Sequence, residues 1–514
     1  MSRKRLGIVS VIAAAALALS ACGGGQEKPG TNGSTAGGGD VITAAIGYDG
    51  DNFDPVSTTS ALALAANWHT LEGLTELDPV TREVSPALAA DLPKQVSDTE
   101  WEATLRDGAK FSDGTDVTID DVVNAFELTT KDFYKPMLSF IEKVEAKDDK
   151  TVTITTAFPF SLVPERLSLV KVFPKAQSAE ERKSKPTGTG PYIMTQAVKS
   201  KNVDFEKNPN YNGKRAAKAD KMHWDILVDD TARVTAVTQG SVMAVDKVPA
   251  VSKSTLEGKA KMESMQAFGL DFIMFNTKKA PFDNPKVRQA FLYAIDSQEL
   301  IDKALGGEGT PATSFLQEDH PNYHQAATVY QHDPEKAKAM LAEAGVSNLN
   351  IKLNTTDHGN ITAIAPLVQQ QLAAVGVTAT IETSASAAMY SNVTDVDDPQ
   401  FDVVLAPGDP SVFGNDPDLL LSWWYGDNPW TQKRSQWKDS EGYTKLHEAM
   451  DRAVRATGDE QQQAWNECFD IVAEEAPIYP LYHKKVTTAW NEDKLDGFKP
   501  ISLTGMSFLD VSAK

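Results

Sequence analysis

Cysteine is almost absent from this chain: 514 residues contain two, Cys22 and Cys468. Cys468 lies in "WNECFDIVAEEAPIYP", a helix-like run in which a small apolar side chain packs well, so we expect it to be buried. If the thiol of Cys22 is covalently modified, Cys468 has no partner and no disulfide can form within the chain. Packing alone must then hold the protein together, and its length permits this.

Positive charge is also scarce. The sequence contains 50 Lys and Arg but 71 Asp and Glu, which gives a net charge of −21. Removal of residues 1–21 would strip three basic residues and no acid, which leaves 47 − 71 = −24. Nucleic acid and anionic lipid repel so acidic a body, so we expect no nucleic-acid partner. A chain of this length is expected to fold as two to four domains.

The common catalytic motifs are missing. The sequence has no G-x-S-x-G, no H-E-x-x-H and no P-loop, and "TGTGPY" (187–192) lacks the third glycine of a dinucleotide loop. His320 and His324 are close together, but their Pro/Asn-rich context and the lack of cysteine partners favour a polar surface loop. We therefore predict no metal, no cofactor and no enzyme. A two-carboxylate hydrolase stays open as a remote alternative, because 71 acids make any single pair uninformative.

Long apolar runs are limited to one, the 16 residues "LGIVSVIAAAALALSA", which follow Arg3, Lys4 and Arg5. A basic start and a short apolar run are typical of an export signal, predicted here as 1–21. The run ends in "LSAC", which resembles a bacterial lipobox, although a plain signal with an incidental cysteine is the alternative. By that resemblance Cys22 is lipidated and anchors the chain to the outer face of the cell membrane. A flexible Gly/Ser linker (22–40) follows and spans about 25 Å.

From residue 41 onward, strand-like and helix-like segments alternate. Helix signals are clear: Thr118 and Asp121 form a capping-box pattern, Pro285 opens a helix, and Asp333 caps another. The predicted strands are 41–49, 151–158, 223–230, 270–276, 350–356, 377–383 and 401–407. This alternation predicts an α/β fold with mixed sheets flanked by helices.

Four segments carry recognisable motifs: "EVSPALAADLPKQVSDTEWEATLRDGAKFSDGTDVTIDDVVNAFE" (83–127), "TGTGPYIM" (187–194), "KNPNYNG" (207–213) and "FNTKKAPFDNPKVRQAFLYAIDSQELID" (275–302). They resemble segments of the family 5 extracytoplasmic solute-binding proteins of peptide- and nickel-type ABC importers. They occur in the family's order, and the resemblance covers about 41–510.

The resemblance implies a two-lobe periplasmic-binding-protein fold that closes on a solute. Lobe 1 would comprise 41–266 and 486–514, with an extra subdomain at about 75–186, and lobe 2 would comprise 267–485. The protein would be a monomer that delivers its solute to an ABC permease and ATPase. A di- or oligopeptide is the expected solute, and an oligosaccharide or another small solute is the alternative.

By the same resemblance, three places would contact the solute. Thr59, Ser60 and Ala61 lie in the loop after an early "DP", and Phe268 and Gly269 lie on an interlobe strand. The third place is "GDPSVFGNDPDLLLSWWYGD" (408–427), where an aspartate would bind the ligand's α-amino group. Asp409 is favoured over Asp416, because "NDPDLLL" also suits a helix that Asp416 caps.

The sequence departs from the peptide-binding pattern just before this stretch. Leu405 and Gly408 stand where peptide-binding relatives place an arginine and a tryptophan, so an obvious partner for the ligand carboxylate is missing. Arg434 is the expected substitute. Trp424 and Trp437 are candidate ligand contacts, since aromatic faces suit sugars and peptide side chains alike. The alternative for "LLLSWW" is a helix with Leu419, Leu420 and Trp423 packed in the core.

Overall fold

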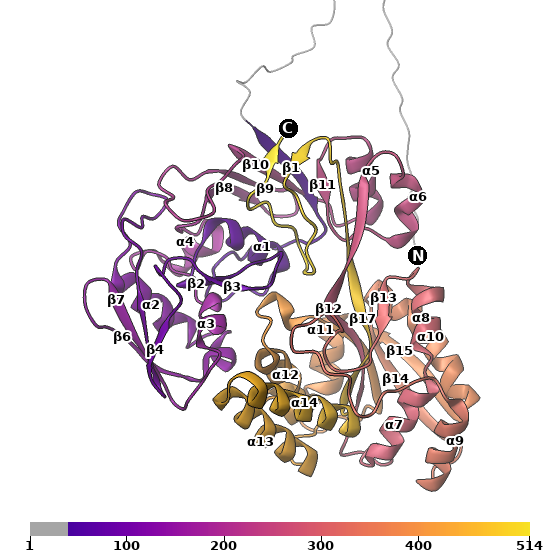
Figure 1. Cartoon of the computed structure of the whole chain (residues 1–514). Coiled ribbons are helices and arrows are strands. Elements are labelled where there is room, and N and C mark those ends of the chain that lie inside the picture. Colours follow the sequence, from indigo (N-terminus) through magenta and orange to yellow (C-terminus); the bar gives the residue numbers. More distant parts are fainter. Residues whose placement is uncertain (1–39) are drawn as a thin grey trace, which may run out of the picture. The chain divides into compact units, whose positions relative to one another are not determined.

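A large mixed sheet runs through the computed structural model, which describes residues 40–514 (Figure 1). The predicted signal segment, nearly all of the linker and Cys22 lie outside the described residues. The sheet order is β15 (Val377–Ser384), β14 (Leu349–Thr356), β16 (Val403–Gly408), β12 (Lys261–Phe275), β17 (Ile478–Trp490), β11 (Ala244–Val245), β1 (Val41–Ile46), β10 (Lys221–Ile226), β9 (Asn202–Lys207) and β8 (Tyr192–Val198), with β13 (Gly309–Pro311) paired to β17. Six of the seven predicted strands are confirmed in this sheet, and the seventh, predicted at 151–158, is β7 (Thr151–Thr156) of a separate four-stranded sheet.

Smaller sheets lie outside this path. They are β2 (Thr75–Leu77) with β3 (Val84–Pro86), β4 (Lys94–Ser97) with β5 (Glu100–Thr104), β7 (Thr151–Thr156) and β6 (Ile141–Ala146), and β18 (Leu495–Asp496) with β19 (Ser512–Ala513). The first two belong to the segment 75–186, where the sequence predicts an extra subdomain.

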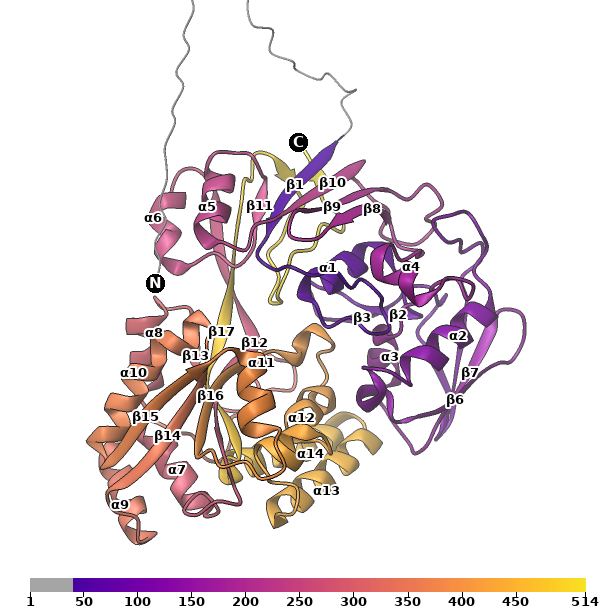
Figure 2. The same cartoon turned by 180° about the vertical axis from the view of Figure 1, so that it is seen from behind.

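Helices flank the sheets, as the fold class requires. They are α1 (Ala61–Thr70), α2 (Ile119–Thr129), α3 (Val163–Arg166), α4 (Ala179–Ser184), α5 (Asp230–Thr238), α6 (Lys253–Leu256), α7 (Pro285–Ala294), α8 (Ser297–Ala304), α9 (Pro334–Glu343), α10 (Gly359–Ala374), α11 (Ser386–Met389), α12 (Pro417–Tyr425), α13 (Glu441–Arg455) and α14 (Gly458–Glu475). In Figure 2, α7 to α10 lie around β14 and β15. In the part of the chain that the structure describes, no helix is long and apolar enough to cross a membrane.

Local sequence explains where these helices begin. Thr118 and Asp121 form the predicted capping box of α2, Pro285 is the first residue of α7, and Asp333 accepts a hydrogen bond from the Lys336 amide at the start of α9. Each cap satisfies an amide that the helix itself leaves free. Cys468 is fully buried in α14, so its predicted packing role is confirmed.

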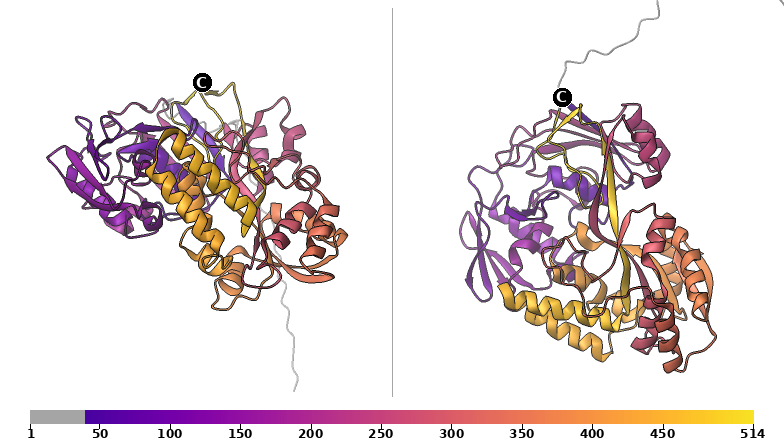
Figure 3. Two further views of the ribbon diagram at one scale, coloured as in Figure 1. Left: turned by 60° about the horizontal axis from the view of Figure 1, so that its bottom comes forward. Right: turned by 45° about the vertical axis from the view of Figure 1, so that its right-hand side comes forward.

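Two long strands, β12 and β17, connect the two lobes (Figure 3). They pair antiparallel along their length, but the ladder is irregular between Gln266 and Leu270. Before this point β12 lies beside strands of lobe 1, and from Leu270 onward it also pairs with β16 of lobe 2. The proposed lobe boundary at 266/267 falls at this irregularity.

Candidate functional site

The parallel strands of each lobe end at polar residues. In lobe 1, β1 and β11 run parallel and are followed by Tyr48, Asp246 and Lys247; in lobe 2, β14 and β16 are followed by His358 and Asp409. Ligands of open α/β sheets bind beyond the carboxyl ends of such strands. These residues therefore mark the candidate binding cleft.

Asp409 is the best-placed acid in this cleft. It caps the short turn η5 (Pro410–Val412), and its Oδ1 accepts hydrogen bonds from the Ser411 amide (3.1 Å) and hydroxyl (2.5 Å). Its Oδ2 faces Gly269, where a Cβ would lie 3.2 Å from that oxygen and 3.2 Å from Lys484 Cε. Within residues 40–514 no group is hydrogen-bonded to this Oδ2, so it is available to a ligand.

Lys484 supplies a positive charge beside Asp409. Its Nζ lies 3.7 Å from Oδ1 of Asp271, a carboxylate that is fully buried. The other oxygen of Asp271 accepts hydrogen bonds from the Tyr482 hydroxyl and from the Asn360 side chain in the first turn of α10. An acid and a cation thus lie next to each other where β12 and β17 cross.

The opposite wall comes from lobe 1. Oδ1 of Asp246 accepts a hydrogen bond from the Gly47 amide (2.7 Å), whereas Oδ2 is buried and has no partner among the described residues. Lys247 follows with φ of +50° and places Nζ 5.3 Å from the ring centre of Tyr48. Non-glycine residues rarely adopt this conformation, and it clusters at ligand sites.

Burial raises the pKa of Asp246 from 3.8 to about 6. The folded state therefore keeps the proton at pH values where the unfolded chain has lost it, so this group makes the free energy of unfolding fall as pH rises from about 4 to about 6. The shift corresponds to about 3 kcal/mol.

Asp246→Asn should remove the contribution of this carboxyl to the pH dependence of the free energy of unfolding. We expect the variant to lose less stability than the wild type over that pH range, measured by urea unfolding at several pH values. Parallel pH profiles of the two proteins would show that the Asp246 carboxyl is not perturbed in this way.

The lobes also touch at two places in the segment that follows Asp409, residues 410–418. Arg166 of α3 binds Asp416 through two bonds of 2.8 and 2.9 Å and binds Asp418 at 2.6 Å. Arg82, in the turn between β2 and β3, donates to the Ser411 carbonyl at 2.6 Å. Lobe 1 therefore holds this segment near Ser411 and again at Asp416.

Burial lowers the pKa of Arg82 to about 10, and the negative charge of Asp409 opposes this shift. Burial likewise lowers the pKa of His358, and Lys484 and Lys247 act in the same direction. Charges from both lobes thus act on one another across the cleft.

Several of the predicted ligand residues have other partners. Asp416 is buried, caps α12 by accepting from the Leu419 amide, and is paired to Arg166. Arg434 forms a two-bond ion pair with Asp395 at 2.8 and 2.9 Å and lies over Tyr390 and Trp430. Asp416 and Arg434 are thus engaged in ion pairs within the protein.

Trp424 and Trp437 are both 1% exposed and lie in the core. Trp424 packs against Phe272 and lies directly over Gly408, where a Cβ would come within 2.2 Å of the indole ring. The core expectation for this helix is confirmed for Leu419 and Leu420 but wrong for Trp423, because Trp424 is the tryptophan that the core encloses. Trp423 is only half-buried and stacks on Phe413.

The remaining predicted contacts lie at α1 and β12. Ser60 caps α1 by accepting from the Ala63 amide, Thr59 is exposed beside it, and Ala61 is half-buried as the first residue of the helix. Phe268 is buried against Phe315. Of the predicted residues, the structure brings Asp409 and Gly269 together.

Sequence reasoning missed Tyr48, Lys247, Lys484, Arg82 and Asp271. Tyr48 lies near the end of the predicted strand 41–49, and Lys247 is the second residue after the short strand β11, so the strand-end rule could have found them. The other three had no local signal.

The two neighbouring histidines contact different groups of the protein. His320 is buried and bonds the Asn415 carbonyl at 2.8 Å, so the expectation of a surface loop is wrong for this residue. His324 lies 3.3 Å from Asp470. Across residues 40–514, no group of three or more His, Cys, Asp or Glu side chains is arranged to hold a metal ion.

Comparison with known proteins identifies the family. The model of the bacterial extracellular solute-binding proteins, family 5, matches residues 83–442, which is more than half of the chain. The chain belongs to this family, whose members capture solutes for ABC importers. Because these are binding proteins and not enzymes, the hydrolase alternative no longer stands.

Individual relatives are more distant. The glutathione-binding protein GsiB of Salmonella typhimurium is 27% identical over 488 residues, which cover 92% of this chain and 94% of the relative. A dipeptide-binding protein from Pseudoalteromonas sp. SM9913, solved with Met-Leu, has a TM-score of 0.76 at 22% identity and covers 92% of this chain and 100% of its own.

NikA from Staphylococcus aureus, solved with Ni(L-His)2, has a TM-score of 0.75 at 18% identity and covers 93% of this chain and 100% of its own. Both solved structures show that the fold is the two-lobe periplasmic-binding-protein type, as the sequence predicts.

Proposed function

We propose that the protein binds a di- or oligopeptide between its lobes and delivers it to an ABC permease. The observation that carries this proposal is the free Oδ2 of Asp409, which faces Gly269 at the carboxyl end of β16. A peptide's α-ammonium group is a cation of the size and charge that this oxygen accepts. The ammonium groups of Lys484 and Lys247 are the candidate partners for the ligand's carboxylate.

The two tryptophans that the sequence offered as ligand contacts give no support to an oligosaccharide. Sugar rings stack on exposed flat faces, but Trp424 and Trp437 are enclosed in the core of lobe 2. The relatives add support, since GsiB is a glutathione-binding protein and the Pseudoalteromonas protein holds a dipeptide. Lipidation at Cys22, anchoring at the outer face of the cell membrane and a monomeric state are parts of the same proposal.

Isothermal titration against three pools tests the proposal: free di- and tripeptides, the same peptides N-acetylated, and oligosaccharides. We expect heat from the free peptides and a large loss on acetylation, because the acetyl group removes the charge that Asp409 binds. Binding of oligosaccharides without peptides would overturn the assignment.

A further inference from the structure

A pocket lies entirely within lobe 1, between α1, the strands β2 and β3 and the loop that follows β9. Its volume is about 460 Å³, which falls within the range of about 300–1,000 Å³ typical of small-molecule sites. Every residue that lines it belongs to lobe 1, so the pocket is separate from the cleft that Asp409 faces. Closure of the two lobes is not needed to form it.

The walls of this pocket are largely apolar. Trp68, Leu77 and Leu509 line it with side chains that are only half-buried, and Pro86 and Ala87 continue the same wall. A flat apolar molecule placed there would cover surface that the protein itself leaves in contact with water. The pocket therefore favours a ligand with an apolar body.

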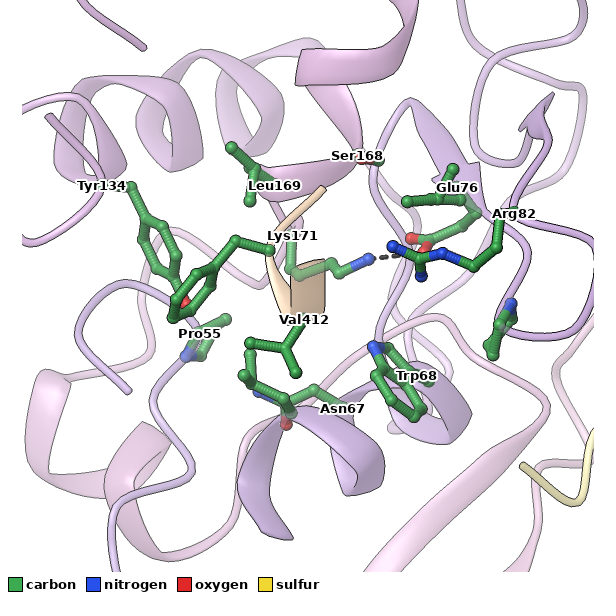
Figure 4. Close-up of a pocket in the computed structure, with 14 residues that line it drawn as sticks. Pro55, Asn67, Trp68, Glu76, Arg82, Tyr134, Ser168, Leu169, Lys171 and Val412 are labelled. Carbon is green, nitrogen blue, oxygen red and sulfur yellow. Dashed lines mark hydrogen bonds and ion pairs between the residues drawn. The ribbon is translucent and has the colours of Figure 1, made fainter. Parts of the chain in front are cut away.

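The acids of the pocket are already neutralised. Each of the three is paired with a basic residue: Glu72 with Arg106, Glu76 with Lys171 and Asp78 with Arg215. Figure 4, which shows the neighbouring pocket at the contact between the lobes, includes the pair of Glu76 and Lys171. Because each carboxylate has a cation beside it, the pocket does not favour a cationic ligand.

Three hydrogen-bond donors in the loop after β9 have no acceptor among the described residues. The Tyr211 hydroxyl accepts a hydrogen bond from the Arg215 amide (3.2 Å), which leaves its own proton unused. The Arg215 guanidinium binds Asp510 through Nε (2.8 Å) and Asp78 through Nη1 (2.5 Å), which leaves Nη2. The third donor is Nζ of Lys214, an exposed residue at the rim of the pocket.

The Tyr211 hydroxyl is held in a fixed place. It lies so close to Gly213 that a Cβ there would come within 2.4 Å of the oxygen, and the Arg106 guanidinium lies 5.7 Å from the centre of the Tyr211 ring. Burial raises the pKa of Tyr211 to about 12, so the hydroxyl keeps its proton at neutral pH and can donate it to an acceptor. A fixed donor beside two cations suits an anionic group.

We propose that this pocket is a second binding site, for an organic anion with a flat apolar body, such as an aromatic carboxylate. The anionic group accepts from Tyr211, Lys214 and Arg215, and the body covers the wall at Trp68. The inference goes beyond the proposed function, because it requires neither a peptide nor closure of the lobes.

Two fluorescent probes test the proposal on the purified full chain. One is 1-anilinonaphthalene-8-sulfonate, an aromatic anion, and the other is N-phenyl-1-naphthylamine, which has the same body without the charge. Lys214→Glu should weaken binding of the anion by about 5- to 20-fold and change binding of the neutral probe by less than about twofold, because only the anion meets the reversed charge. Ser85→Trp fills the pocket from its exposed rim and should weaken both probes by about 10-fold or more.

Lys218→Glu is the matched control, because Lys218 is exposed in the same loop and does not line the pocket. This variant should bind both probes as the wild type does. An equal loss of the anion in Lys218→Glu and Lys214→Glu would show a general effect of charge and overturn the assignment. Wild-type affinity in both Lys214→Glu and Ser85→Trp, or no binding of the anion to the wild type, would also overturn it. None of these results depends on whether the protein binds a peptide.

Discussion

Asp409→Ala should weaken the binding of a peptide with a free amino terminus by about 2–5 kcal/mol, or roughly 30- to 4,000-fold. The reason is that the substitution removes the carboxylate oxygen that faces Gly269 and leaves the ligand's ammonium group in the cleft without an anionic partner. Isothermal titration with one peptide measures the change directly.

Asp427→Ala is the matched control for this variant. Asp427 lies in the same acidic stretch, but it is exposed and pairs with Lys438 at 2.5 Å. We expect its affinity to be that of the wild type. Unchanged affinity in Asp409→Ala would show that the ligand's amine binds elsewhere, and an equal loss for the N-acetylated peptide would show that Asp409 acts without contacting the amine.

Asp416→Ala should lower the free energy of unfolding by about 3–5 kcal/mol, because it leaves the buried Arg166 guanidinium short of a partner. Arg166 and Asp416 have side chains 3% and 4% exposed. The same change also removes the cap of α12. Urea unfolding of the variant and the wild type measures this loss in the free energy of unfolding.

A combined substitution separates charge from structure. In the triple variant Arg166→Met, Asp416→Asn and Asp418→Asn, the buried guanidinium and both carboxylates that bind it are removed together, so we expect much of the stability to return. The exposed pair of Lys438 and Asp427 is the comparison, and removing it should cost less than about 1 kcal/mol. A loss of that small size for Asp416→Ala would indicate that α3 and α12 do not meet in solution.

Local patterns in the sequence predict a good part of this structure. The strand and helix alternation, the capping box at Thr118 and the helix start at Asp416 and Pro417 depend on neighbouring residues, and all of them appear as expected. The family motifs are equally local, which is why the fold class follows from the sequence.

The site depends on contacts that no local pattern encodes. Lys484 of β17 lies beside Asp271 of β12 only because the crossing strands bring together positions more than 200 residues apart. Arg166 and Asp416 are 250 positions apart, so the sequence shows a cap at Asp416 but not its ion pair. Trp424 is likewise enclosed by β12 and by Gly408 of β16, and this burial becomes visible only in the folded chain.

The central claim is that the cleft holds a peptide by its amino terminus. Native mass spectrometry of the protein purified without added ligand, followed by fragmentation of whatever it releases, tests this most directly. We predict peptides with free amino termini. Release of an oligosaccharide, or of peptides with blocked amino termini, would contradict the account.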